Sequence, residues 1–324
     1  MKGVENDAFD LIAVGLNAVD VLVRLPVEIK RDEKQFVEDL LIQGGAPMGS
    51  SSAAVARMGY RTAFVTRLGE NTLSSICLEQ YRDSGVSTEL VVRDGESRPA
   101  IALVEIDPVT SARTVFIQME NYGYLQPGDI PSGDITRARV LLVDSYDLDA
   151  TEAALEAAKG TGCRTVLDFE SGDRERLIRL LALGTDPILP LAAARNLTGR
   201  DEAQETVRAL ADLSPEQVVI TDGVNGSWAW DRASEQVRHQ PAFKVDARDS
   251  TGCGDAFHAG YAIGLLEGWD LTLRMEFGSL LASRVATEVG GRTALPFRKE
   301  VEGLIQPNIS PQLADRLRQL SATA

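Results

Sequence analysis

The sequence has few of the residues that build metal centres and disulfide frameworks. Its 324 residues include three cysteines, Cys77, Cys163 and Cys253, and two histidines, His239 and His258. No two cysteines have CxxC spacing, which argues strongly against a zinc site made of His and Cys. An odd and sparse set of cysteines is typical of a reducing compartment, so we expect a cytoplasmic protein.

Long apolar runs and an excess of positive charge are also lacking. No apolar run approaches the roughly 20 residues that span a bilayer, and residues 1–10 lack the apolar segment of a signal peptide. The chain has 33 Lys and Arg against 48 Asp and Glu residues, a net charge of −15. A nucleic-acid binder needs a basic surface. We therefore expect neither a membrane nor a nucleic acid as partner, whereas an anionic ligand stays open because local backbone N–H groups can outweigh net charge.

The order of the apolar segments predicts an α/β protein. Short apolar strands alternate with helices from about residue 139 onward, and the strands are 140–143, 165–168, 187–189 and 217–221. Such alternation predicts a doubly wound, mostly parallel sheet flanked by helices, in which ligands bind beyond the carboxyl ends of the strands. One helix, residues 150–159, is expected to be capped by Asp149 and ended by Gly160.

The N-terminal half adds a smaller β element. Residues 11–14 read as a buried strand, while residues 98–107 and 112–118 alternate apolar and polar side chains around a turn-rich loop, 107–111. This pattern predicts a β-hairpin, one side of which is exposed to water or covers something. We therefore predict a single domain over residues 1–324 with a small β excursion.

The most informative local feature is the segment DSTGCGDAFHAG, residues 249–260. Gly252 and Gly254 flank Cys253, and Asp255 opens a helix. Glycines that lead into a helix leave backbone N–H groups pointing one way, which suits a phosphate, and the helix dipole is expected to keep Asp255 ionised. A phosphoryl transferase needs this combination, because the carboxylate deprotonates a hydroxyl while the N–H groups stabilise charge on the transferred group.

Spacing alone leaves a second interpretation open, a glycine-rich turn in which Asp255 is an ordinary helix-start residue. A dinucleotide-binding loop is less well supported, because the GxGxxG pattern fails at Phe257 and no strand runs directly into the segment. A P-loop is excluded, since GxxxxGK[ST] occurs nowhere in the chain.

Two further glycine-containing segments favour ligand binding. Residues 42–60, IQGGAPMGSSSAAVARMGY, place Gly44 and Gly45 ahead of a small-residue helix, where glycine lets a ligand approach the backbone. Tight helix–sheet packing explains these glycines equally well. The segment TDGVNG, residues 221–226, follows a strand at the edge where a nucleotide contact is expected.

These three segments, in this order and at these separations, resemble the PfkB (ribokinase-like) family of carbohydrate kinases over nearly the whole chain. DSTGCGD is similar to the family's C-terminal signature DTTGAGD, with Ser250 and Cys253 as departures. The GG pair with ARMGY is similar to the N-terminal signature, and VGLNAVD, residues 14–20, is similar to the first strand.

The resemblance implies an ATP-dependent, Mg²⁺-using kinase that phosphorylates a primary hydroxyl of a furanose sugar. It implies that Asp255 is the catalytic base and that Gly252, Cys253 and Gly254 form the anion hole. The other implied contacts are Thr221, Gly223 and Gly226 for the nucleotide and Asn17, Asp20, Gly44 and Gly45 for the sugar.

The resemblance also implies a β-sheet lid, built from segments of about 16–42 and 98–120, that covers the sugar and forms a homodimer. On the loops where many members bind a monovalent cation stand Asp249, Thr251, Gly290 and Arg292. K⁺ is therefore a candidate cofactor.

Two departures from the family pattern narrow the class of substrate that the resemblance implies. Gly49 stands where many members have an Asn that contacts the sugar. Residues 190–193 lack the family's NxxE motif, linked to Mg²⁺, which leaves Asp168 and Glu170 as candidates beside the nucleotide phosphates. The missing motif and GGRTALP, residues 290–296, resemble the ketohexokinase and sulfofructose kinase branches, which implies a ketose or ketose-derived substrate.

Four polar residues are candidates for selecting that substrate: Lys34, Arg98, Arg113 and Asn121. Lys34 lies at about the place where sulfofructose kinases carry a lysine for an anionic group. A solvated surface residue is the plainer interpretation of any one of them. For His258, helix packing is favoured over a role in the site.

Two other functions stay open. A nucleoside kinase of the same fold would need an apolar slot for a base, for which Phe116, Tyr122 and Tyr124 are the candidate walls. A non-catalytic sugar-binding regulator would share the fold, but the retained Asp255 and its glycines argue against it.

Overall fold

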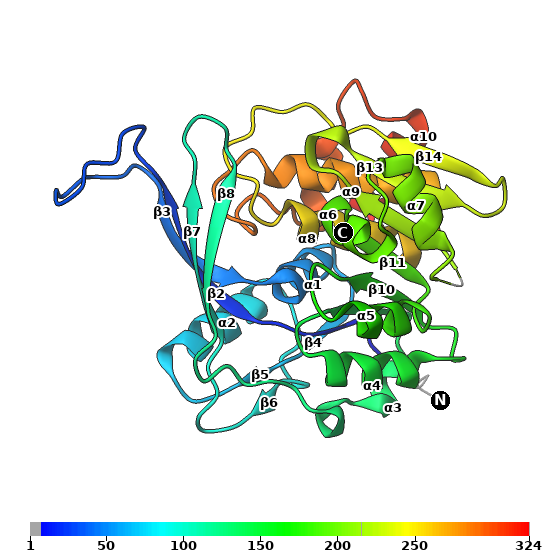
Figure 1. Ribbon diagram of the computed structural model, residues 1–324, viewed down its shortest axis with the longest axis horizontal. Helices are drawn as coiled ribbons and strands as arrows, with labels where there is room; N and C mark the ends of the chain where they lie inside the picture. The colour runs from blue at the N-terminus through cyan, green and yellow to red at the C-terminus, as the bar shows by residue number, and fades with distance from the viewer. Residues whose placement is uncertain (1–7, 215, 324) are drawn as a thin grey trace.

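Eight strands form the main sheet of the computed structural model (Figure 1). The structure describes residues 8–214 and 216–323, so residues 1–7, on which most of the signal-peptide expectation rests, lie outside the described residues. In spatial order the strands are β14 (Gln236–Gln240), β13 (Ser227–Asp231), β12 (Val218–Thr221), β11 (Asp186–Pro190), β10 (Arg164–Asp168), β9 (Val140–Asp144), β1 (Leu11–Val14) and β4 (Thr62–Val65). Only β12–β13 and β13–β14 are antiparallel within this sheet. The predicted α/β class is confirmed.

The central strands are buried on both faces because they are continuous apolar runs. Every residue of β1 and β9 is buried, and Leu11 pairs in parallel with Val140. Since successive side chains point to opposite faces, Leu11 lies in one apolar core and Ile12 in the other.

Two layers of helices complete these cores (Figure 1). The Leu11 side is covered by α1 (Pro47–Arg57), α2 (Thr72–Asp83), α8 (Cys253–Leu266), α9 (Leu271–Val285), α10 (Pro311–Ala322) and the 3-10 helix η3 (Arg298–Leu304). The Ile12 side is covered by α3 (Ser132–Ile135), α4 (Leu148–Ala158), α5 (Arg174–Leu181), α6 (Leu191–Thr198) and α7 (Ala203–Ala211). Two short 3-10 turns, η1 (Pro127–Asp129) and η2 (Gly223–Asn225), lie in connections. No helix in the described part of the chain has the length and apolar character needed to cross a membrane.

Helix α4 begins earlier than the sequence suggested. Its N-cap is Asp147, whose side chain makes no capping hydrogen bond, and Asp149 lies inside the first turn and pairs with an arginine of α5. The expected capping role of Asp149 is therefore wrong. Gly160, with φ 74°, follows the helix end as predicted.

A second, four-stranded sheet stands at the left of Figure 1. Its strands, in order, are β3 (Leu40–Gly45), β2 (Ala18–Arg24), β7 (Ala100–Ile106) and β8 (Arg113–Gln118), and a short ribbon joins β5 (Arg67–Leu68) to β6 (Val92–Arg93). The predicted hairpin is confirmed, because β7 and β8 pair antiparallel. β7 alternates buried and less buried residues, whereas all six residues of the edge strand β8 are exposed.

Candidate active site

The carboxyl ends of the central strands meet the N-terminus of α8 at one edge of the main sheet. β9 ends at Asp144 and β10 at Asp168, while α8 brings Asp255 to the same edge within its first turn. His258 of α8 holds the helix there, because its Nε2 lies 2.9 Å from the carbonyl oxygen of Ile188 in β11.

The start of α8 is shaped as an open row of N–H groups. Gly252 is the N-cap, in the left-handed conformation with φ 75°, and within the described residues no side chain caps this helix. The first N–H groups of a helix have no partners inside it. The N–H of Cys253 makes a long contact, 3.4 Å, with the carbonyl oxygen of Ser250, and those of Gly254 and Asp255 follow it in the first turn. A side chain at position 252 would collide with Gly291, so the turn needs glycine for space as well as conformation.

Asp255 keeps an opening to solvent while protein surrounds most of its carboxylate. Desolvation raises the pKa of Asp255, against the opposing charges of His258, Arg113 and Arg292 and a hydrogen bond from Ser50. The expectation that the helix dipole keeps this group fully ionised is therefore wrong, since burial outweighs it.

Other carboxylates crowd the same edge. Burial raises the pKa of Asp168 well above its usual range, with added repulsion from Glu170 and Asp255. Asp144, fully buried, accepts hydrogen bonds from the N–H groups of Leu16 (2.8 Å) and Tyr146 (3.0 Å). Asp168 and the more exposed Glu170 form an oxygen-rich rim, and carboxylate oxygens are ligands that Mg²⁺ prefers.

His258 packs as well as facing the site. Its Nδ1 lies 2.8 Å from the carbonyl oxygen of Gly254 and 3.5 Å from an oxygen of Asp168. The favoured packing role is confirmed by the contact to β11, and the ring also places a donor beside the carboxylate cluster.

The residues predicted to bind sugar lie where the second sheet joins the main body. Asp20 of β2 faces Gly45 so closely that any side chain at position 45 would collide with its carboxylate. Burial raises the pKa of Asp20 to about 7. Asn17 is fully buried, and its Nδ2 donates to Thr66 while its Oδ1 has no partner in the described part of the chain.

The departure at Gly49 has a structural cause. A Cβ at position 49 would lie 2.6 Å from Nη2 of Arg292 and 3.0 Å from the hydroxyl of Tyr81. The guanidinium of Arg292 therefore fills the space that a larger residue at this position would occupy. A Cβ at Gly44 would also meet Arg292, at 2.6 Å from Nη1.

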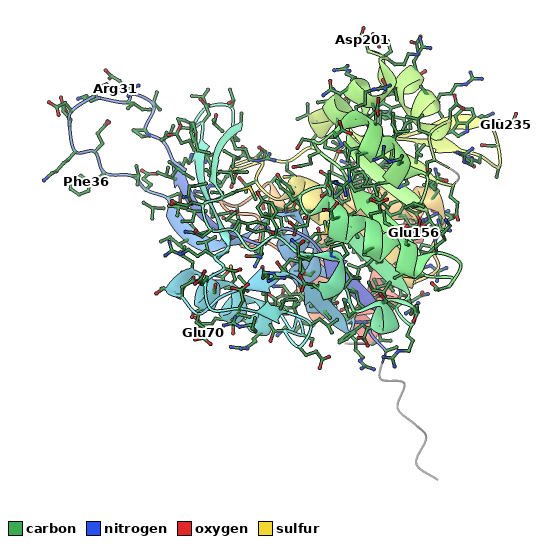
Figure 2. The ribbon with its side chains drawn as sticks, turned by 60° about the horizontal axis from the view of Figure 1, so that its bottom comes forward. Arg31, Phe36, Glu70, Glu156, Asp201 and Glu235 are labelled. Atoms are coloured by element: carbon green, nitrogen blue, oxygen red, sulfur yellow. The ribbon has the colours of Figure 1, made fainter. Side chains whose placement is uncertain are left out.

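Only one of the four candidate selectivity residues reaches the anion hole in this chain. Nη1 of Arg113, on β8, lies 3.0 Å from the carbonyl oxygen and 3.2 Å from the hydroxyl of Ser250. Arg98 and Asn121 are exposed and linked through their backbones at 2.9 Å. Lys34 lies on the connection between β2 and β3, which protrudes at the left of Figure 1 away from α8 and carries the labelled Arg31 and Phe36 of Figure 2.

The predicted nucleotide loop follows β12. Thr221 ends that strand, Gly223 starts η2 in open space, and Gly226 has φ 94°. His239 supports this loop, which no local pattern predicted: its Nε2 lies 2.8 Å from the carbonyl oxygen of Asn225, and its ring stacks on Trp228 at 3.8 Å.

The predicted cation loops contact each other directly. Asp249 accepts from the N–H groups of Thr251 and Gly290, both at 2.8 Å, and the carbonyl oxygen of Arg292 accepts from Arg57 at 2.9 Å. Within the described residues, no group of three or more His, Cys, Asp and Glu side chains is arranged to hold a metal. Potassium binding stays a prediction.

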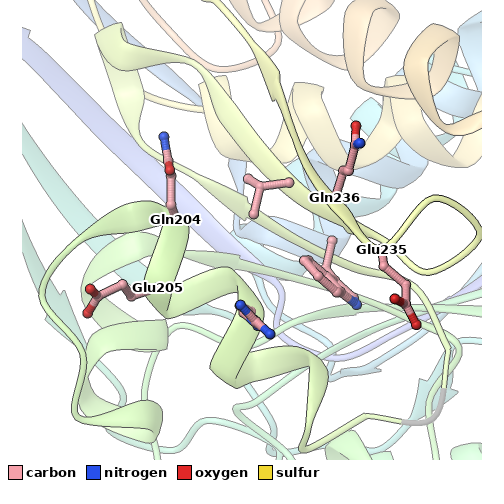
Figure 3. A pocket seen from close by; sticks show the side chains of 7 residues that line it. Gln204, Glu205, Glu235 and Gln236 are labelled. Atoms are coloured by element: carbon pink, nitrogen blue, oxygen red, sulfur yellow. The ribbon is translucent and has the colours of Figure 1, made fainter.

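A cavity of about 680 Å³ lies elsewhere, between α7 and the β13–β14 hairpin (Figure 3). Arg208 and Trp230 line it, with the Arg208 guanidinium 5.5 Å from the Trp230 ring. It contains none of the predicted site residues.

Comparison with known proteins agrees with this geometry. The sequence pattern of the pfkB family carbohydrate kinases matches residues 24–298. The chain is 27% identical to a 5-dehydro-2-deoxygluconokinase of Shouchella clausii and 26% identical to one of Bacillus subtilis, in each case over 93% of this chain and 97% of the relative.

Solved structures share the fold. A putative ribokinase from Agrobacterium tumefaciens superposes with a TM-score of 0.83 and 23% identity, over 96% of this chain and 98% of the other. Arabidopsis thaliana ribokinase complexed with ribose and ATP superposes with a TM-score of 0.78 and 22% identity, over 94% of this chain and 100% of the other.

Proposed function

The chain belongs to the pfkB family of carbohydrate kinases and is a sugar kinase, and we propose that it transfers the γ-phosphoryl group of ATP to a primary hydroxyl of a ketose-derived sugar acid. The observation that carries the proposal is Asp255 beside the open N–H groups of α8. The names of the relatives support the substrate class.

Different residues of this chain have different roles in the phosphoryl transfer. Asp255 orients the sugar hydroxyl and accepts its proton, which its raised pKa favours. The N–H groups of Gly252, Cys253 and Gly254 bind the transferred group, and Arg113 adds positive charge at the same turn. Thr221 and the glycines after it hold the nucleotide.

Asp168 and Glu170 fit Mg²⁺ chemically, because a bound cation would offset the burial and mutual repulsion that raise the pKa of both carboxyl groups. When bound with the nucleotide, Mg²⁺ supplies positive charge to the phosphate oxygens. Asp20 accepts hydrogen bonds from sugar hydroxyls, and the second sheet acts as a lid over the sugar within one kinase domain.

The second sheet also offers a surface for a homodimer. Leu103 and Phe116 are paired across β7 and β8, so they lie on the same face of the sheet, and they are 40% and 54% exposed. Sedimentation of the wild type and of Phe116→Asp tests this: a dimer that dissociates in the variant is expected, and an unchanged monomer overturns it.

ADP release, measured over 5-dehydro-2-deoxygluconate, other sugar acids, fructose, sulfofructose, ribose and nucleosides, tests the substrate. We expect the highest kcat/KM with a keto sugar acid. Faster turnover of a nucleoside would favour the nucleoside kinase, although Tyr122 is 6% exposed with its hydroxyl held by Asp147 at 3.2 Å, which closes one wall of the slot that kinase needs. Silence over the whole panel would favour the non-catalytic regulator.

A further inference from the structure

The turn between β7 and β8 buries one serine in an otherwise exposed loop. Ser111 is 7% exposed, whereas Val109, two residues earlier, is 77% exposed. Ser111 also has φ 57°, a left-handed conformation that residues other than glycine rarely adopt. Its hydroxyl donates to the carbonyl oxygen of Ala247 in the main body at 2.7 Å. The turn is therefore shaped to bring this hydroxyl to the main body.

Asp107 and Arg24 hold the turn in this shape. The carboxylate of Asp107 accepts from the N–H of Thr110 at 2.7 Å, and its carbonyl oxygen accepts from the N–H of Ser111 at 3.0 Å. From the neighbouring strand β2, Arg24 donates to the carbonyl oxygen of Pro108 at 2.9 Å. Because these contacts already order the turn, bringing Ser111 to the main body costs little further conformational entropy.

A second contact from the same hairpin reaches the segment that leads into the anion hole. Nη1 of Arg113 donates to the carbonyl oxygen of Ser250 at 3.0 Å. The N–H of Thr251, which belongs to the same peptide group as that carbonyl, donates to the carboxylate of Asp249 at 2.8 Å. Both sides of this peptide group are therefore fixed, one by the hairpin and the other by Asp249.

This peptide group lies directly before the N-terminus of α8. Gly252, the N-cap, follows it, and the N–H of Cys253 lies 3.4 Å from the Ser250 carbonyl oxygen. Since N–H···O hydrogen bonds are usually about 2.7–3.2 Å long, this contact is weak and the Cys253 N–H can still donate to a ligand. The orientation of the Ser250 carbonyl therefore decides whether that N–H bonds within the turn or faces the site.

We propose that Ser111 is a positioning residue, which together with Arg113 holds residues 247–250 in the geometry that leaves the anion-hole N–H groups open. The inference rests on the proposed function, in which these N–H groups bind the transferred phosphoryl group. The lid that covers the sugar therefore also sets the geometry of the phosphate site. Small misplacements of groups that stabilise a transition state cost large factors in rate.

Ser111→Gly tests the proposal, with Val109→Gly as the matched control. Glycine adopts φ 57° without strain, so Ser111→Gly removes the hydroxyl contact and adds backbone freedom to the turn. Val109→Gly adds similar freedom to the same turn but removes only an exposed side chain.

Two measurements are made on each variant. Hydrogen exchange, followed by mass spectrometry on peptides that contain residues 248–252, reports the order of the segment without any catalysis. The N–H groups that report it are those of Arg248, bonded to the carbonyl oxygen of Ala286 at 2.8 Å, and Thr251. Steady-state ADP release gives kcat and KM.

We expect Ser111→Gly to speed exchange in these peptides about 3- to 10-fold and to lower kcat about 3- to 10-fold, with KM for ATP unchanged. Val109→Gly should match the wild type in both measurements. Unchanged exchange in Ser111→Gly, or faster exchange with full kcat, would overturn the positioning role. A raised KM at unchanged kcat would also overturn it, because the contact would then serve lid closure alone.

Arg113→Met provides a second test by exchange, since its effect on kcat also includes the loss of positive charge. Exchange should rise at least as much as in Ser111→Gly, and if Ser111→Gly does not fold, this result decides alone. Asp255→Asn separates the inference from the proposed function. Full activity in Asp255→Asn shows that the proposed base is wrong, whereas an inactive Asp255→Asn beside a fully active Ser111→Gly shows that only the positioning role fails.

Discussion

Two clusters of carboxylates lie at opposite ends of the same parallel strands, and they are built differently. At the amino end, Asp186 opens β11 and is fully buried. Its oxygens meet Arg164 at 2.6 Å, Arg274 at 3.3 Å and the hydroxyl of Tyr261 at 2.9 Å. At the carboxyl end, Asp168 is also buried, and its carboxylate lies 3.5 Å from Nδ1 of His258.

The two clusters differ in how far cationic side chains offset the charge of the buried carboxylates: we call the amino-end cluster compensated and the carboxyl-end cluster uncompensated. Burial raises the pKa of Asp20, Asp144, Asp168 and Asp255, all near the carboxyl edge, because too few cations face them. Two arginines and a tyrosine face Asp186 instead. The amino-end cluster therefore stabilises the fold, and the carboxyl-end cluster is kept for ligands at a cost in stability.

The largest expected effect is on turnover. Asp255→Asn removes the proton acceptor but keeps the shape, so kcat should fall by about 10³- to 10⁴-fold, or roughly 4–6 kcal/mol. Sugar affinity, measured by calorimetry with a non-hydrolysable ATP analogue, should change little. Turnover near the wild-type rate would place the base elsewhere.

The Asp20→Asn variant tests this contrast through the pH dependence of the unfolding free energy. The pKa of Asp20 is about 7 in the fold against a usual 3.8, so its contribution to stability is complete below about pH 4 and is lost as the pH rises through 7. Three pKa units correspond to at most about 4 kcal/mol. The variant should therefore gain unfolding free energy over wild type at pH 8 and less of it at pH 5, measured by urea unfolding. An advantage that is equal at both pH values would contradict this assignment, and a raised sugar KM would add support for its binding role.

A smaller effect is expected from the compensated cluster. Tyr261→Phe removes one donor to Asp186 and leaves both arginines, so the unfolding free energy should fall by about 1.5–3 kcal/mol with kcat unchanged. Tyr124→Phe, which alters a side chain that is 49% exposed, is the control and should leave stability unchanged. A loss of kcat in Tyr261→Phe at full stability would contradict the purely structural role of the amino-end cluster.

Much of the fold and the outline of the site follow from local pattern. β1, β9 and β10 are short buried apolar runs, and the glycines at 252 and 254 predict the turn into α8. These features can be predicted because they depend on neighbours in sequence. The start of α4 was missed because several residues near Asp149 can cap a helix.

Contacts between polar and charged residues far apart in the sequence could not be predicted from local pattern. Arg292 reaches Ser50 across 242 residues and Tyr261 reaches Asp186 across 75, so no local spacing reveals either contact. The same holds for Asp255, whose pKa is raised chiefly by the protein packed around it. Sequence motifs located the site, whereas only the fold shows which charges are left uncompensated.

One comparison tests the central claim most directly, the unfolding free energies of Asp255→Asn and Asp186→Asn against wild type at pH 8. Both substitutions replace a carboxylate with an amide of the same shape. We predict that Asp255→Asn is as stable as wild type or more so, because burial outweighs the cations that face this carboxylate and disfavours its charged form. Asp186→Asn is expected to lose about 3 kcal/mol or more, because Arg274 loses its carboxylate partner and Arg164 keeps only Glu216. Equal destabilisation by the two substitutions would contradict the account.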